Sequence, residues 1–174
     1  MTREMAPGWV LEIEESTVQH WVATCGDTLM VFAYEASHDD ARHVYVGARA
    51  FEKLLQRFGR PVGLMFVVAP HGKPPSERVR KAFATVSRRL ALQASRAAVV
   101  IEGTGFISAL HRGAASGLLT LLRPKFPVSI VGTTREGLDY LLGPRLAEVP
   151  ALITLCGERS KGPEVGVSIG DGLK

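Results

Sequence analysis

The chain has 174 residues, of which 46% are hydrophobic and 22% are charged, and its formal net charge at pH 7 is +4. This length suits one domain with a substantial core, and this composition excludes a wholly disordered chain. No apolar run approaches the roughly 20 residues that cross a bilayer, and Met1–Pro7 lacks the apolar stretch of a secretory signal, so we expect a cytoplasmic protein.

The N-terminal third of the sequence has the period-two alternation of β-strands. Segments 9–13, 17–23 and 28–34 alternate, and Gly26-Asp27 separates the last two as a hairpin turn would. We therefore expect an antiparallel hairpin, preceded by a third strand, to open the fold. Ser37-His38-Asp39-Asp40 then offers helix-capping side chains ahead of a helix that ends at Gly59.

The middle of the chain predicts a buried strand followed by a basic helix. Residues 62–69 form a continuous apolar run between prolines, as in a strand covered on both faces. A helix is expected from Ser76 to about Ala94, with a core stripe at four-three-four spacing. It carries a local net charge of +4, and four of its cations fall largely opposite the stripe: Arg78, Lys81, Arg88 and Arg89.

Residues 97–142 have the pattern of a crossover unit on a mainly parallel sheet. An apolar strand at 97–101 runs into a glycine-containing turn and a helix with apolar positions from Phe106 to Leu122. A second buried strand at 128–131 precedes a short helix capped near Thr133. A last helix is expected at 146–155, with Pro150 near its start, and Val165–Ile169 offers an edge strand.

Together these elements predict an α/β fold, a single layered domain with N-terminal antiparallel strands and a parallel βαβ core over residues 1–156. Residues 157–174 are expected to form a loosely ordered tail, because their composition turns to glycine, serine, lysine and proline. Cys25 and Cys156 have no CxxC spacing, so we expect free thiols. His20, His38 and His43 lack HxxxH or HxH spacing, so no metal site is expected.

The order and hydropathy of these elements resemble the STAS and SpoIIAA-like family over roughly residues 9–142, most clearly at Val99–Ile107 and Val128–Leu141. The resemblance implies a small α/β domain without enzymatic activity. Family members antagonise anti-sigma factors, regulate stress-signalling assemblies or transporters, or are suspected to bind lipids or nucleotides.

The resemblance also implies a switch or contact site after the 97–101 strand. Glu102 matches the acidic position of the family, and Thr104 and Ser108 lie where a phosphorylatable residue is found, although the usual Asp-Ser-Ser-Gly sequence is absent. His111 and Arg112 follow in the same segment. A phosphate at a helix N-terminus meets free N–H groups, whereas a plain capping role for Thr104 needs no function at all.

Three functions remain open at this point. The first is a non-catalytic regulatory or scaffolding domain for signalling, which contacts a protein partner through 102–112 and the basic helix. The second is a small-ligand or lipid-binding module with an apolar pocket between helices and sheet. The third is a small enzyme centred on His71 and His111.

Other partners and cofactors are disfavoured by the residues. No cofactor is expected, because Ser108 replaces the third glycine of a dinucleotide-binding G-x-G-x-x-G turn. Nucleic acid is disfavoured, because aromatic residues are not interleaved with the arginines. Ser116 lacks the G-x-S-x-G elbow of hydrolases. A homo-oligomer is compatible with the sequence.

Overall fold

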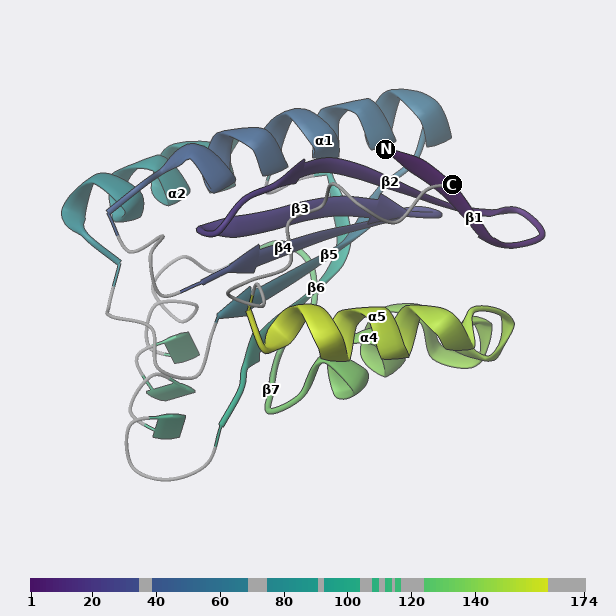
Figure 1. Cartoon of the computed structure of the whole chain (residues 1–174). Coiled ribbons are helices and arrows are strands. Elements are labelled where there is room, and N and C mark those ends of the chain that lie inside the picture. Colours follow the sequence, from purple (N-terminus) through teal and green to yellow (C-terminus); the bar gives the residue numbers. More distant parts are fainter. Residues whose placement is uncertain are drawn as a thin grey trace.

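The chain folds into one seven-stranded mixed sheet whose strands lie in sequence order (Figure 1). The structure is a computed structural model that describes residues 1–34, 39–68, 75–90, 93–103, 108–109, 112–113, 115–116 and 124–162, with only the backbone of residues 89 and 90. The strands are β1 (Thr2–Ala6), β2 (Trp9–Ser16), β3 (His20–Cys25), β4 (Thr28–Ala33), β5 (Val62–Val68), β6 (Ala94–Ile101) and β7 (Val128–Val131).

The first four strands are antiparallel, and the predicted hairpin is confirmed as β3–β4. Cys25 pairs with Thr28 across Gly26-Asp27, and Gly26 has the positive φ of 54° that such a tight turn favours in glycine. Strand β1 was not expected, because its residues are largely exposed and show no apolar alternation. The expected strand at 17–23 is shifted, since residues 17–19 form the turn before β3.

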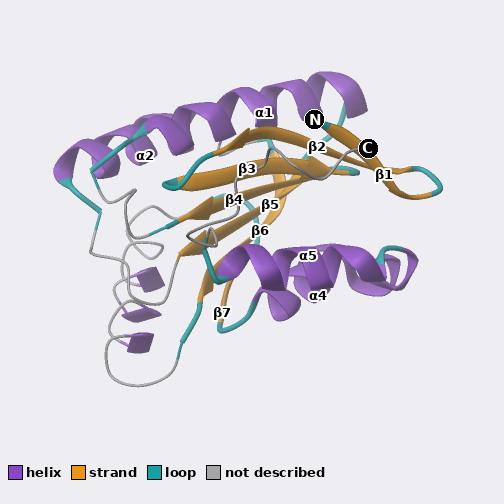
Figure 2. Ribbon diagram, in the orientation of Figure 1, coloured by secondary structure: helices purple, strands orange, loops and turns teal. Residues whose placement is uncertain are grey.

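The last four strands are parallel, and helices lie on both faces of the sheet (Figure 2). A right-handed crossover puts its helix on a fixed side, so strands added in one direction gather their helices on one face. Helices α1 (Arg42–Phe58) and α2 (Glu77–Leu90) share that face, and α4 (Thr134–Leu142) and α5 (Pro150–Ser160) cover the opposite one (Figure 2). The α/β class and the parallel core are therefore confirmed.

The sheet is buried on both sides, with alternate residues of each strand entering two cores. On the side of α4 and α5, Trp21 and Phe32 are nearly inaccessible and meet edge to face, with ring centroids 5.2 Å apart. On the side of α1, Val22 and Val31 pack against Phe51. Burial on both faces explains why these strands read as continuous apolar runs.

Several predicted boundaries were wrong for local reasons. Helix α2 ends at Leu90 rather than near Ala94, because Ala94 pairs with Val62 and begins β6. The last helix begins at Pro150, since the residues before it form the 3₁₀ helix η2 (Gly143–Glu148) with proline in its first turn. Helix α5 continues to Ser160, so the helical part extends beyond the expected limit at 156. Most of the helix expected at 106–122 and the strand expected at 165–169 lie outside the described residues.

The short helix α4 begins where the sequence predicts and has a complete capping box. The backbone N–H of Glu136 donates to Thr133 Oγ1 at 3.2 Å, and Glu136 Oε2 accepts from the N–H of Thr133 at 3.1 Å. These two bonds satisfy N–H groups that a helix leaves free at its start.

Gly137 lets α4 lie directly on the sheet, so its replacement by alanine should destabilise the protein. An added Cβ would lie 2.8 Å from Val100 Cγ2 and 3.1 Å from Met65 Sδ. Overpacking of this kind costs about 1–3 kcal/mol, which exceeds the gain of up to about 1 kcal/mol in helix propensity. We expect Gly137→Ala to lower the free energy of unfolding, measured in urea, by about 1 kcal/mol.

Gly157→Ala is the matched control, because Gly157 lies within α5 and an added Cβ there would meet nothing within 4 Å. That change should raise the free energy of unfolding by about 0.5–1 kcal/mol through helix propensity alone. Equal effects of the two substitutions would contradict the close approach of α4 to the sheet.

Candidate functional site

Polar side chains gather at the edge of the sheet where the parallel strands end. Strands β5 and β6 end together, since Val68 pairs with Ile101, and the last residue of β4, Ala33, pairs with His20 at the start of β3. Helices α1 and α2 begin after β4 and β5 respectively, so their N-termini lie near this edge (Figure 1). Open α/β sheets bind ligands and partners outside the carboxyl ends of their strands, so the candidate site is sought here.

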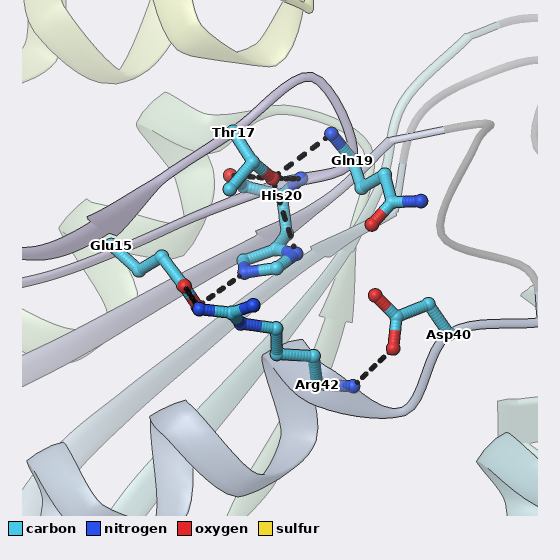
Figure 3. A network of polar contacts seen from close by, with 6 residues as sticks. All are labelled: Glu15, Thr17, Gln19, His20, Asp40 and Arg42. Atoms are coloured by element: carbon cyan, nitrogen blue, oxygen red, sulfur yellow. Dashed lines mark hydrogen bonds and ion pairs between the residues drawn. The ribbon is translucent and has the colours of Figure 1, made fainter.

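A buried network of Glu15, Thr17 and His20 forms one side of this edge (Figure 3). His20 is completely buried, and its Nε2 lies 2.7 Å from Glu15 Oε2. A register shift between Ile13 and Glu15 marks a β-bulge, and bulges re-aim side chains at such positions. Arg42, at the start of α1, completes the network through an ion pair with Glu15.

Glu15 stays ionised in this setting. Burial by itself raises the pKa of the carboxyl, but the hydrogen bonds and charges of His20 and Arg42 together lower that pKa below its ordinary value. The Arg42 side chain is 65% exposed, whereas the Glu15 side chain is only 14% exposed. The network therefore presents one cation to solvent and keeps its carboxylate inside.

The Thr17 side chain forms hydrogen bonds within the turn between β2 and β3. Its Oγ1 accepts from the backbone N–H of Gln19 at 3.1 Å and of His20 at 3.0 Å, the pattern of a threonine-stabilised turn. The same hydroxyl lies 3.4 Å from His20 Nδ1 and 3.3 Å from the His20 carbonyl oxygen. The hydroxyl therefore stabilises the backbone of the β2–β3 turn.

A second buried histidine, His43, lies one residue after Arg42 on the inner face of α1. Its ring packs among aromatic rings, with centroids 5.9 Å from His20 and from Phe83 and 6.1 Å from Phe66. Its Nδ1 has no hydrogen-bond partner among the described residues. Burial, with the nearby His20, lowers the pKa of His43 to about 4 despite the opposing effect of Asp40. His43 is therefore neutral at pH 7.

The structure brings together three of the residues predicted at the end of the 97–101 strand. Ser108 is buried, and its Oγ donates to the Glu102 carbonyl oxygen at 3.3 Å. Arg112 Nη1 donates to the carbonyl oxygens of Ile101 at 3.1 Å and Gly103 at 3.3 Å. Ser108 and Arg112 thus bind the backbone where β6 ends. Thr104, His111, His71 and Lys73 lie outside the described residues.

Sequence reasoning missed the Glu15, His20 and His43 cluster. Metal-ligand spacing does not identify these histidines, because their signal is positional: His20 begins an alternating strand, and His43 falls on the apolar side of the α1 wheel. The contact between Glu15 and His20 follows from the hairpin and its bulge, which spacing alone does not reveal. No group of three or more His, Cys, Asp or Glu side chains suited to a metal occurs in the described ranges.

The basic face of α2 is solvent-exposed, as its helical pattern predicts. Val79 is buried, while Arg78, Arg80, Lys81 and Arg88 are exposed or half-exposed. Lys81 Nζ pairs with Glu77 at 2.7 Å, and Arg88 Nε donates to the Ala84 carbonyl oxygen at 3.0 Å. Arg78 and Arg80 form no ion pair with the part of the chain that the structure describes. The Arg89 side chain lies outside it.

Two hollows open on the surface of the described residues. One, of about 440 Å³, lies between α1 and α2 and is lined by Tyr45, Glu77, Arg78, Lys81, Ala82 and Thr85. The other, of about 380 Å³, lies between β1–β2 and α5, with Leu11, Ile13 and Leu155 among its walls. Many walls of the second hollow are exposed side chains, including Met1 and Ala151, so it lacks the enclosure typical of a small-ligand pocket.

Comparison of the chain with protein-family models, with curated proteins and with solved structures found no match. Among the described residues, no helix has the length and apolar character needed to cross a membrane.

Proposed function

We propose that this protein is a non-catalytic regulatory or scaffolding domain, STAS-like in function, that works through protein–protein contacts made by the basic face of α2. The observation that carries the proposal is the outward display of Arg78, Lys81 and Arg88 from one helix whose opposite side is fixed in the core. Exposed arginines favour recognition of acidic groups on a partner, because the guanidinium fork pairs well with carboxylates.

Polar side chains at the carboxyl edge of the sheet are engaged in hydrogen bonds with the backbone, which favours a protein-contact function over catalysis. Ser108 and Arg112 hydrogen-bond to the backbone at the end of β6, and Thr17 supports the turn that holds His20. These side chains stiffen the ends of the strands. The exposed cations of α2 are then the better candidates for contact with a partner.

The two free cysteines are compatible with the cytoplasmic location that we propose for the domain. Both Cys25 and Cys156 are buried, and burial raises the pKa of Cys25 to about 11. Thiols of this kind remain protonated and unreactive at neutral pH. They act as small core side chains, with Cys156 Sγ 3.6 Å from Met30 Sδ.

Charge reversal on α2 is expected to abolish partner capture. We would immobilise wild-type protein and the Arg78→Glu/Arg88→Glu variant and quantify the proteins each retains from a lysate of the source cells. Because two attractive contacts become repulsive, retention of the specific partner should fall by about tenfold or more in the variant. Ser108→Ala, which leaves the α2 face unchanged, should retain the partner.

The matched control is Arg135→Glu/Lys161→Glu, which changes net charge equally at exposed positions on the other side of the sheet. It should retain the partner at the wild-type level, and circular dichroism should show all variants folded. Equal loss in both double variants, or no loss in either, would contradict the proposal.

A further inference from the structure

The groove between α1 and α2 combines an aromatic anchor with positive charge. Ala41, which precedes α1, and Val44 of α1 pack against Val79 and Ala82 of α2, and these small side chains let the two helices approach closely. Tyr45 lies on the outer side of this seam and is 52% exposed, one of three large apolar side chains so exposed among the described residues. An exposed tyrosine beside arginines is typical of the energetic centre of protein interfaces.

The positive side chains follow the groove along α2. Arg78, Lys81 and Arg88 are spaced by three and seven residues, which places them on one side of the helix over about 15 Å. Arg78 and Lys81 line the groove itself, and Thr85, whose Oγ1 donates to the Lys81 carbonyl oxygen at 2.9 Å, lies between them and Arg88. These three cations fit a bound segment with several acidic groups along its length better than they fit one isolated anion.

We infer that this groove binds an acidic segment of a partner protein, with an apolar side chain of that segment against Tyr45 and its carboxylates along Arg78, Lys81 and Arg88. The inference rests on the proposed function and specifies the partner for the same surface. A segment that lies in a groove between two helices exploits apolar anchors at regular spacing, with charges on the rim setting its register.

The same groove fits nucleic acid poorly. Tyr45 is its single aromatic side chain among the described residues, whereas single-stranded nucleic acid is bound by successive stacking platforms. A protein segment with alternating acidic and apolar residues complements both the charge and the shape of the groove.

A random peptide library displayed on phage tests this inference, because the groove itself then selects the segments that it binds. Twelve-residue peptides, about long enough to span the groove as a helix, would be selected on the folded full-length chain. We expect the enriched peptides to carry several Asp or Glu around an aromatic or aliphatic residue. Synthetic copies should bind in fluorescence anisotropy about tenfold more weakly when salt is raised from about 50 to about 300 mM.

Variants of the chain locate the binding. Tyr45→Ser should weaken the selected peptide by about tenfold, and Arg78→Glu/Arg88→Glu should weaken it by more. Val18→Ser is the matched control, since Val18 is also a strongly exposed apolar residue but lies in the β2–β3 turn, and it should leave binding unchanged.

Three outcomes would overturn the inference: enriched peptides without acidic residues, a selected acidic peptide whose affinity ignores Tyr45→Ser, or tighter binding of a poly-dT oligonucleotide than of any selected peptide. The proposed function is tested separately by capture of the cellular partner. A partner lost on α2 charge reversal but unaffected by Tyr45→Ser would leave the protein-contact function standing and the groove assignment refuted.

Discussion

Replacement of Asp27 by alanine is expected to lower the free energy of unfolding by about 3 kcal/mol at pH 7. Asp27 lies in the β3–β4 turn, and its side chain is only 8% exposed. Its carboxylate accepts two hydrogen bonds from Arg145 in η2, at 3.0 and 3.2 Å, and one from Arg60 after α1 at 2.7 Å. Alanine leaves both guanidinium groups without this partner.

The expected loss in free energy of unfolding depends on how exposed the two arginine partners of Asp27 are. Arg60 and Arg145 are 57% and 45% exposed, so water compensates part of the loss, and the cost stays at the low end for a buried pair. Arg145 also lies over the Trp9 ring at 4.9 Å, and Trp9 Nε1 donates to Glu148 at 3.0 Å. Loss of Asp27 therefore loosens the attachment of η2 to the N-terminal strands.

The pH dependence of the Asp27 effect has a definite sign. Burial alone raises the pKa of Asp27, but Arg145 and then Arg60 lower it below its ordinary value of 3.8. A lowered carboxyl pKa contributes stability above the unfolded-state pKa, and this contribution is lost as pH falls through the folded-state pKa. The difference between wild type and Asp27→Asn in urea unfolding should therefore shrink as the pH falls below 3.8.

Asp139→Asn is the control for charge removal at an exposed site. Asp139 is 57% exposed and meets Arg135 at 4.0 Å, so its replacement should change stability by less than about 0.5 kcal/mol. An Asp27→Ala variant as stable as this control would show that the two arginines gain nothing from the carboxylate.

Replacement of His43 by phenylalanine is expected to protect the protein against acid. The folded-state pKa of His43 is lowered to about 4, so below pH 6.5 the unfolded chain binds a proton that the folded chain refuses. Stability conferred by the neutral ring is complete above pH 6.5 and declines as pH falls toward 4. The difference between the two pKa values corresponds to about 3 kcal/mol.

Phenylalanine suits the site because His43 already packs against Phe66 and Phe83 and has an unpartnered Nδ1 within the described structure. Its neighbours Glu15, His20, Asp40 and Arg42 remain in both proteins, so the comparison isolates one titrating group. Urea unfolding at about pH 7.5 should give similar stabilities. At about pH 4.5 the variant should be more stable than wild type by about 2 kcal/mol, and parallel pH profiles would contradict a buried neutral histidine.

The amount of structure predictable from sequence differs between the fold and the site. Strands β5 and β7, helix α1 and the α4 capping box were predicted because their signals are local: an apolar run, a helical period, a Thr-x-x-Glu pair. Strand β1 was missed because an exposed edge strand needs no apolar alternation. The α2–β6 boundary was misplaced because pairing with Val62 overrode helix propensity.

The site depended on contacts between residues far apart in the chain. The outward face of α2 was predictable, since it depends only on the period of one helix. That Tyr45 stands beside Arg78 and Lys81 depends on how α1 and α2 pack, and that Asp27 holds Arg145 depends on the whole sheet. The periodicity of apolar residues thus determined which side of each element is buried, because this pattern is set by residues within the element itself. Only the tertiary structure decided which polar groups meet. Those contacts join elements that are far apart in the sequence, and residue spacing along the chain does not show which elements become neighbours.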